Sequence, residues 1–265
     1  MYSATQLARK YFKYYLAASN AKGHGVHSPF VFDFIKFVKN DSQVYECYPK
    51  IEELRMQLLR TKAFIEVRDF GAGSTVLKTR QRAIYKMSQS SLKPRKFAQL
   101  LYRIVQYYKP QTILELGTSF GITSAYLASA NAAATVHTLE GSPSIASIAR
   151  SHFDSLNLQN VHLTEGDFTH TLQPLLNDLP MVDLAFIDGN HRKEPTLQYF
   201  QCLLAKINEQ SILIFDDIHW SQEMEEAWEQ IKSDSRVTLS IDLFFIGLIF
   251  FRKDFKETQH YSIRF

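Results

Sequence analysis

The stretch that decides the fold is TILELGTSFGIT, residues 112–123 of this 265-residue chain. Its first residues, Thr112, Ile113 and Leu114, show no alternation of polar and apolar side chains, which is typical of a strand buried on both faces in a parallel α/β sheet. The strand then reaches Glu115 and turns at Gly117 before a new segment begins. A glycine turn lets the backbone approach a ligand closely, and the helix that follows offers unpaired N–H groups to it.

The rest of the chain repeats the order of strand and helix. Strands are expected in the segments TVHTLE, VHLTEGD, VDLAFIDG and SILIFDD, with helices near residues 144–156, 172, 195 and 223–231. The last two strands, at residues 237–241 and 244–252, have only a short link between them and therefore run antiparallel. The sequence predicts a doubly wound, seven-stranded, mostly parallel sheet with an antiparallel C-terminal hairpin.

This pattern resembles the class I, Rossmann-like S-adenosylmethionine-dependent methyltransferases, whose first strand ends in E-x-G-x-x-x-G. The resemblance covers roughly residues 111–265 and implies that S-adenosyl-L-methionine is the cofactor. Ser119 stands where the dinucleotide-binding pattern G-x-G-x-x-G has its second glycine. A nicotinamide-dependent dehydrogenase is therefore disfavoured.

Candidate cofactor ligands lie at the carboxyl ends of the predicted strands, where open α/β sheets bind ligands. Glu140 follows the glycine turn by about 20 residues, where a carboxylate can accept both ribose hydroxyls. The resemblance implies that Asp167 accepts the adenine amino group and that Glu115 faces the methionine ammonium. The alternative for each acid is a helix N-cap or a solvated acid. The complete predicted cofactor set is Glu115, Gly117, Ser119, Gly121, Thr123, Glu140, Asp167 and Asp188.

Two further motifs, FIDGNH at 186–191 and FDDIHW at 215–220, end neighbouring strands. They resemble the catechol and caffeoyl-CoA type of O-methyltransferase, in which Asp, Asp and Asn bind Mg²⁺ and a Lys lies near the acceptor oxygen. The resemblance implies a metal site of Asp188, Asp216 and Asp217, with Asp217 in place of the Asn. His191 falls where the catechol enzyme has its Lys and is the candidate general base. The alternative is that Asp216 and Asp217 cap the next helix and that transfer relies on orientation alone.

The balance of charged residues changes at the start of the predicted sheet, between residues 111 and 112. Residues 1–111 hold 20 Lys and Arg against 7 Asp and Glu, whereas residues 112–265 hold 10 against 20. We expect residues 1–111 to form a basic, aromatic-rich, helical lid region and residues 112–265 to form the cofactor-binding domain. The glycine-containing stretches at 23–29 and 64–74 are expected to be loop or lid segments.

Composition also bounds the compartment and the partners. The chain has two cysteines, Cys47 and Cys202, and lacks the run of about 18 apolar residues that a membrane span needs. We therefore expect a cytoplasmic protein with a small-molecule substrate, no membrane partner, and the option of a homodimer through the N-terminal region.

The expected activity is methyl transfer to a small molecule, at a phenol or catechol oxygen and with help from Mg²⁺. One alternative is an RNA methyltransferase that uses the basic N-terminal region. The other is a non-catalytic cofactor-binding protein of the same fold.

Overall fold

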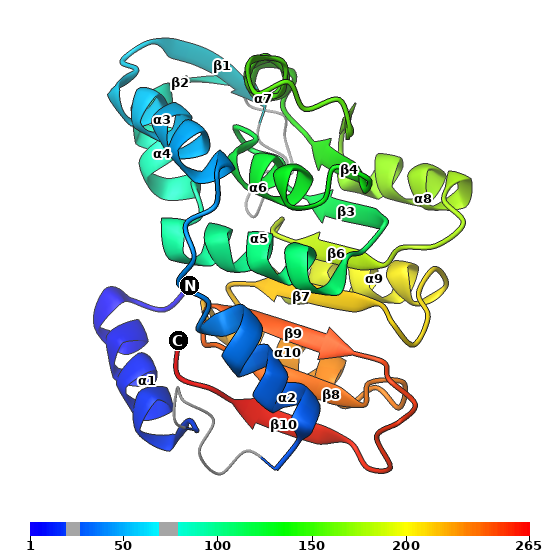
Figure 1. Cartoon of the computed structure of the whole chain (residues 1–265). Helices are drawn as coiled ribbons and strands as arrows, with labels where there is room; N and C mark the ends of the chain where they lie inside the picture. Colours follow the sequence, from blue (N-terminus) through cyan, green and yellow to red (C-terminus); the bar gives the residue numbers. More distant parts are fainter. Residues whose placement is uncertain (20–26, 69–78) are drawn as a thin grey trace. The chain divides into compact units, whose positions relative to one another are not determined.

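A computed structural model of the chain describes residues 1–19, 27–68 and 79–265 (Figure 1). The expected loop or lid segments at 23–29 and 64–74 fall partly outside these ranges. The chain divides into two compact units, which we describe separately. Unit 1 comprises Met1–Asn40 and Leu179–Phe265, and unit 2 comprises Asp41–Asp178.

Unit 2 contains the strand predicted from the opening motif. The three parallel strands are β3 (Thr112–Leu116), β4 (Thr135–Glu140) and β5 (Val161–Glu165), with β4 between the other two. Ile113, Leu114 and Leu116 are fully buried, as expected for a strand covered on both faces.

The described residues of unit 2 also form six helices and two further strands. These strands are antiparallel and pair Phe64 with Ala83, so the predicted N-terminal region also contains strands. Helix α6 follows the glycine turn and is almost entirely buried, which its small and apolar residues permit. The bounds are α3 (Cys47–Arg60), β1 (Phe64–Arg68), β2 (Thr79–Ala83), α4 (Ile84–Ser91), α5 (Arg95–Tyr108), α6 (Ile122–Ala130), α7 (Pro143–Ser155) and α8 (Phe168–Asp178).

In the part of unit 1 that the structure describes, five strands lie in the order β10-β8-β9-β7-β6. Strands β6 and β7 are parallel, and β9 runs antiparallel to both β7 and β8, which confirms the predicted hairpin. The short polar strand β10, which the sequence analysis missed, pairs in parallel with β8. The bounds are β6 (Leu184–Ile187), β7 (Ile212–Asp216), β8 (Leu239–Asp242), β9 (Ile246–Phe250) and β10 (Gln259–Ser262).

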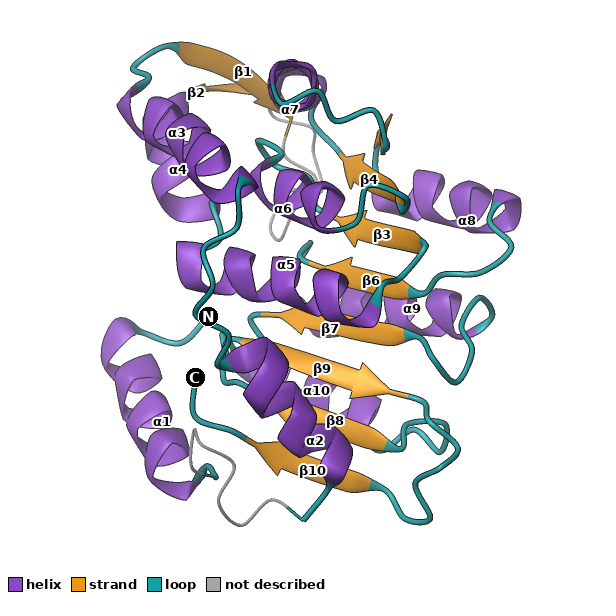
Figure 2. Ribbon diagram, viewed as in Figure 1, coloured by secondary structure: helices purple, strands orange, loops and turns teal. Residues whose placement is uncertain are grey.

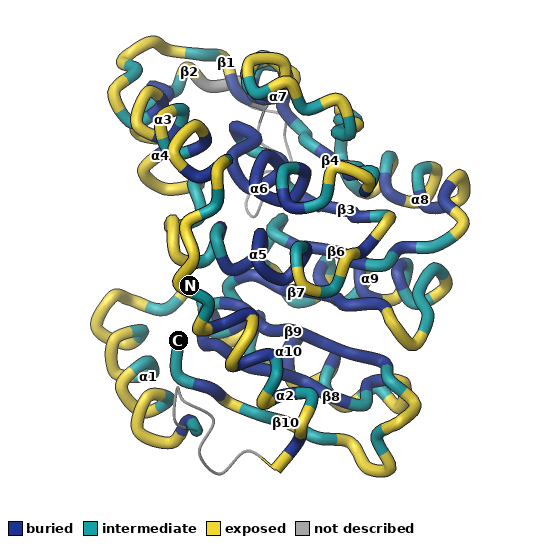
Figure 3. Tube along the Cα trace, in the orientation of Figure 1, coloured by how far each residue is buried: buried dark blue, intermediate teal, exposed yellow. Residues whose placement is uncertain are grey.

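Helices cover the strands of unit 1 on both sides. In Figure 2, α2 crosses in front of the strands and α10 lies behind them. Helix α1 begins at a capping box between Ser3 and Gln6 and has no buried residue, in contrast to the buried strands β7 and β9 (Figure 3). The bounds are α1 (Ala4–Ala17), α2 (Pro29–Asp33), the π-helix η1 (Phe34–Lys39), α9 (Lys193–Leu204) and α10 (Gln222–Lys232).

The predicted fold class is confirmed: the protein is α/β, with mostly parallel strands and an antiparallel hairpin near its C-terminus. The predicted number of seven strands is wrong, because β10 adds an eighth. The boundary between residues 111 and 112 stays a prediction. Among the described helices, none is long and apolar enough to cross a membrane.

Candidate functional site

The turn between β3 and α6 is built from backbone conformations that favour glycine. Gly117, Ser119 and Gly121 have φ angles of 107°, 48° and 79°. The amide of Gly117 donates to the carbonyl of Leu139 at 3.1 Å, which ties the turn to the end of β4. A Cβ on Gly121 would lie 2.7 Å from a ring carbon of Phe153. Gly121 is therefore required both by the backbone and by close packing.

Glu115 is fully buried just before this turn. Its Oε2 accepts hydrogen bonds from the hydroxyls of Ser124 and Thr138, the latter at 2.6 Å. The other oxygen, Oε1, accepts no hydrogen bond from the described residues. Burial raises the pKa of Glu115 to about 7, although the two hydroxyls lower it. A buried carboxylate with one unsatisfied oxygen fits a cationic partner such as the ammonium of the cofactor.

Glu140 joins the turn to the end of β4. Its Oε2 accepts from the amide of Ser119 and its Oε1 from the amide of Ser142, each at 2.9 Å. Burial raises the pKa of Glu140, and these amide hydrogen bonds oppose the rise. Because each carboxylate oxygen has two acceptor sites, both can still accept a ribose hydroxyl.

Asp167 caps the start of α8. A helix cap was one alternative role for this acid in the sequence analysis. Its Oδ1 accepts from the amide and the hydroxyl of Thr169, both at 2.9 Å. Its Oδ2 accepts no hydrogen bond from the described residues, so a cap and an adenine contact are compatible. Thr123 lies in the first turn of α6 and is almost buried.

Sequence reasoning missed the hydroxyls that hold these acids. Thr138 lies directly opposite Glu115 in the parallel pair β3–β4, and its hydroxyl is also 2.6 Å from that of Thr118. The signal was a Thr in an otherwise apolar stretch of a buried strand. The hydroxyl of Ser91, at the end of α4, lies 3.2 Å from that of Ser119.

Unit 1 brings together Asp188, His191 and Asp216. One ligand atom from each lies within 4.8 Å of the others, and Nε2 of His191 is 3.4 Å from Oδ1 of Asp188. Asp188 follows β6 and Asp216 ends β7, so the parallel pairing of these strands places both carboxylates at one edge. Two carboxylates and an imidazole form a donor set that fits Mn²⁺ or another divalent transition metal, and also Mg²⁺ if water completes the shell.

Asp217 is not in this group, and its role as a ligand stays a prediction. Its backbone is left-handed, with a φ of 53°, and its amide donates to the carbonyl of Phe245 at 2.6 Å. The alternative that Asp216 and Asp217 cap α10 is wrong. The N-cap of α10 is Ser221, whose hydroxyl accepts from the amide of Met224 at 3.2 Å.

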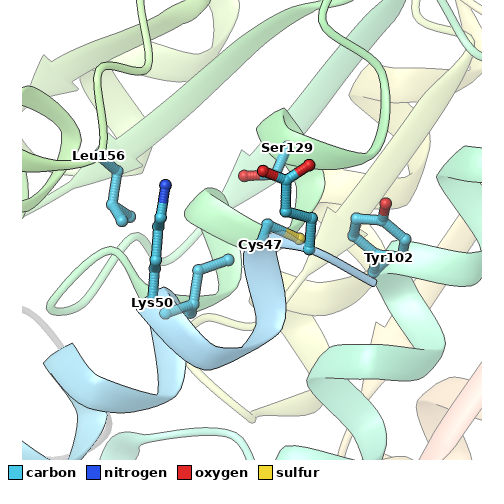
Figure 4. A pocket seen from close by; sticks show the side chains of 7 residues that line it. Cys47, Lys50, Tyr102, Ser129 and Leu156 are labelled. Carbon is cyan, nitrogen blue, oxygen red and sulfur yellow. The ribbon is translucent and has the colours of Figure 1, made fainter. Parts of the chain in front are cut away.

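A separate cavity of about 290 Å³ lies in unit 2 (Figure 4). It is lined by Glu46, Cys47, Lys50, Ile51, Tyr102, Ser129 and Leu156, none of which belongs to the predicted site. Burial raises the pKa of the Cys47 thiol, which favours the thiol over the more nucleophilic thiolate.

A family model and a relative each match part of the chain. Residues 114–218 match the sequence model of a family described as "Methyltransferase domain". The chain is 29% identical over 77 residues to an uncharacterised protein of Acanthamoeba polyphaga mimivirus, a match that spans 28% of this chain and 35% of that protein.

Many solved structures share the fold, and two of them illustrate the similarity. The S-adenosylhomocysteine-bound Podospora anserina methyltransferase PaMTH1 has a TM-score of 0.62 and 15% identity, covering 96% of this chain and 98% of that chain. A putative caffeoyl-CoA O-methyltransferase from Staphylococcus aureus has a TM-score of 0.55 and 18% identity, covering 62% and 88% respectively. Residues 114–218 therefore resemble a methyltransferase domain, and the chain shares its α/β fold with these solved methyltransferase structures.

Proposed function

We propose that this protein transfers the methyl group of S-adenosylmethionine to a phenolic oxygen of a small molecule, with a divalent cation held by Asp188, His191 and Asp216. The observation that carries the proposal is the convergence of these three side chains at the carboxyl ends of β6 and β7. Oxygen-rich sites at such strand ends are where open α/β sheets place their ligands.

The demands of phenol chemistry support this choice. A phenol with a pKa near 10 lies about 3 units above neutral pH, so forming its anion costs about 4 kcal/mol. When bound, a divalent cation acts as a Lewis acid that stabilises the developing negative charge on oxygen. Asp188 and Asp216 would hold the cation. Nε2 of His191 lies 3.4 Å from Oδ1 of Asp188 and would be the third ligand, so in this proposal His191 is a metal ligand and not the general base that the sequence predicted.

Residues of unit 2 would bind the methyl donor. Glu140 would accept the ribose hydroxyls, Asp167 the adenine amino group, and the buried Glu115 would face the ammonium. In the transfer step the acceptor oxygen forms a bond to the methyl carbon while the carbon–sulfur bond breaks and sulfur keeps the electron pair. The acceptor proton leaves to water, because Nε2 of His191 would be bound to the cation, and S-adenosylhomocysteine is released.

A methyl-transfer assay with a catechol acceptor tests this proposal. The assay is run with Mg²⁺, with Mn²⁺ and with a chelator, on the wild type and on two variants of adjacent acids. We expect chelation to abolish transfer, Asp216→Asn to lower the metal-stimulated rate by roughly 100-fold, and Asp217→Asn to change it by less than about fivefold. Full activity in the chelator, with Asp216→Asn equal to the wild type, would overturn the metal-assisted mechanism.

The partners stay proposals as well. We propose a small-molecule acceptor rather than RNA, because the cations of residues 1–111 are spread along the sequence and do not form one run. A homodimer through the N-terminal region and a cytoplasmic location are further expectations. Filter binding with RNA at physiological salt tests the choice of acceptor, and gel filtration tests the homodimer.

A further inference from the structure

Glu225, in the first turn of α10, collects hydrogen bonds from distant parts of unit 1. Its Oε2 accepts from the hydroxyl of Tyr2 at 2.7 Å. The ammonium of Lys10 donates to both carboxylate oxygens, at 2.9 and 3.0 Å. Nδ1 of His219 lies 3.1 Å from Oε1. One carboxylate thus joins the start of the chain to the loop between β7 and α10.

His219 is held from its other side by Asp242, the last residue of β8. Nε2 of His219 lies 2.8 Å from Oδ2 of Asp242, and the ring stacks on Phe244 with 5.1 Å between centroids. Oδ1 of Asp242 accepts from the amide of Phe244 at 2.7 Å. Because both ring nitrogens face carboxylates and the ring face is covered, the position of His219 is fixed in three directions.

The loop that contains His219 begins directly after Asp216 and ends at Trp220. The amide of Tyr2 donates to the carbonyl of Trp220 at 3.0 Å, and the amide of Trp220 donates to the carbonyl of Asp217 at 2.9 Å. The indole of Trp220 lies 5.7 Å from the ring of His191. The N-terminal residues therefore hold the backbone of Trp220, whose ring lies beside His191 of the candidate metal site.

We propose that Tyr2, Lys10, His219 and Glu225, here called the Glu225 cluster, are positioning residues that fix Trp220 as an aromatic wall for the acceptor ring. An indole face favours planar aromatic groups, so this assigns an aromatic rather than an aliphatic acceptor. The inference rests on the proposed methyl transfer. The first ten residues of the chain then contribute to the acceptor site. Tyr2 hydrogen-bonds to the loop at 217–220, and Tyr2 and Lys10 both hydrogen-bond to Glu225.

The molecule offers a matched pair of variants on one helix. Glu226 follows Glu225 in α10 and pairs with Lys193 at 2.9 Å instead of with the N-terminal residues. Glu225→Gln and Glu226→Gln therefore make the same chemical change one residue apart. Tyr2→Phe removes a single hydroxyl from the cluster and serves as a second, milder variant.

Fluorescence gives a readout that needs no methyl transfer. The chain has two tryptophans, Trp220 and Trp228, and Trp228 is only 1% exposed, so acrylamide quenching reports mainly on Trp220. In the full-length protein we expect Glu225→Gln to raise the quenching constant about twofold, Tyr2→Phe to raise it less, and Glu226→Gln to leave it at the wild-type value.

Kinetics then test the consequence for the substrate. We expect Glu225→Gln to raise the KM for an aromatic acceptor by about tenfold while the KM for S-adenosylmethionine stays within about twofold. Equal acrylamide quenching constants in the Glu225→Gln, Tyr2→Phe and wild-type proteins would overturn the positioning role of the Glu225 cluster, whether or not methyl transfer occurs. Altered quenching with no methylation of any aromatic acceptor would leave the positioning of Trp220 intact and refute the proposed function.

Discussion

Thr138 and Glu115 face each other across the parallel strands β3 and β4, and the Thr138 hydroxyl donates to Oε2 of Glu115 at 2.6 Å. The pair is fully buried, so the hydroxyl takes the place of the water that would otherwise solvate the carboxylate. Glu115, which lies in β3 just before the glycine turn, is thus held by a side chain of the neighbouring strand β4.

Replacing Thr138 by Val keeps the shape of the side chain and removes this donor. Leaving a buried carboxylate oxygen without it should lower the free energy of unfolding by about 1–3 kcal/mol. Urea denaturation measures this loss. Thr135→Val, at the partly exposed start of β4, is the control and should change the stability by less than about 0.5 kcal/mol. Equal losses in the two variants would show that the Thr138 hydroxyl contributes nothing specific.

Glu115 should make stability depend on pH. Its pKa in the folded protein, about 7, lies above the ordinary value of 4.5, so ionisation is disfavoured by folding. The contribution of Glu115 to the free energy of unfolding is therefore highest below pH 4.5. It declines as pH rises from 4.5 to about 7 and is level above that. The decline from this one group amounts to about 3 kcal/mol.

The matched measurement compares urea unfolding of the wild type and of Glu115→Gln at several pH values. The neutral amide should remove this part of the slope between pH 4.5 and 7. Parallel stability curves for the two proteins would place the pKa of Glu115 near its ordinary value.

Gly121 should tolerate no larger residue. A Cβ there would lie 2.7 Å from the Phe153 ring, and the φ of 79° strains any other residue. Gly121→Ala should cost about 1–3 kcal/mol and weaken the binding of S-adenosylhomocysteine. The double variant Gly121→Ala, Phe153→Leu should recover part of the lost stability if the clash is the cause. No recovery would assign the whole cost to the backbone.

Glu140 should contribute directly to cofactor affinity. Glu140→Ala removes the proposed acceptor for the ribose hydroxyls and also the partner of the Ser119 and Ser142 amides. Calorimetry should show S-adenosylhomocysteine binding weakened by at least about tenfold. Glu165→Ala, at the end of the adjacent strand β5, changes an exposed acid paired with Arg150 and should leave affinity unchanged. Equal affinity in both variants would contradict the ribose assignment.

The sequence predicted those parts of the fold that follow from local pattern. Buried strands such as β3 and β7 carry apolar runs that end in acids, and the missing helix before β9 required an antiparallel hairpin. Strand β10 was missed because four residues of mixed polarity, QHYS, carry no strand signal until β8 is there to pair with them.

The sequence could predict a site residue where the position of that residue depends only on the end of its own strand. Asp188 and Asp216 could be placed together because parallel neighbours bring their ends together. The placement of Asp217 depends on a left-handed turn and a hydrogen bond to Phe245, and neither is visible in the residue types. The Glu225 cluster joins residues more than 200 positions apart, so no local pattern could reveal it.

The most direct test of the account is a crystal structure of the protein grown with S-adenosylhomocysteine and Mn²⁺, with anomalous diffraction used to locate the metal. We predict the nucleoside at the turn formed by residues 117–121, with its ribose hydroxyls on Glu140. We also predict one anomalous peak ligated by Asp188, His191 and Asp216. A structure with no metal between these side chains, or with the nucleoside bound away from Glu140, would contradict the account.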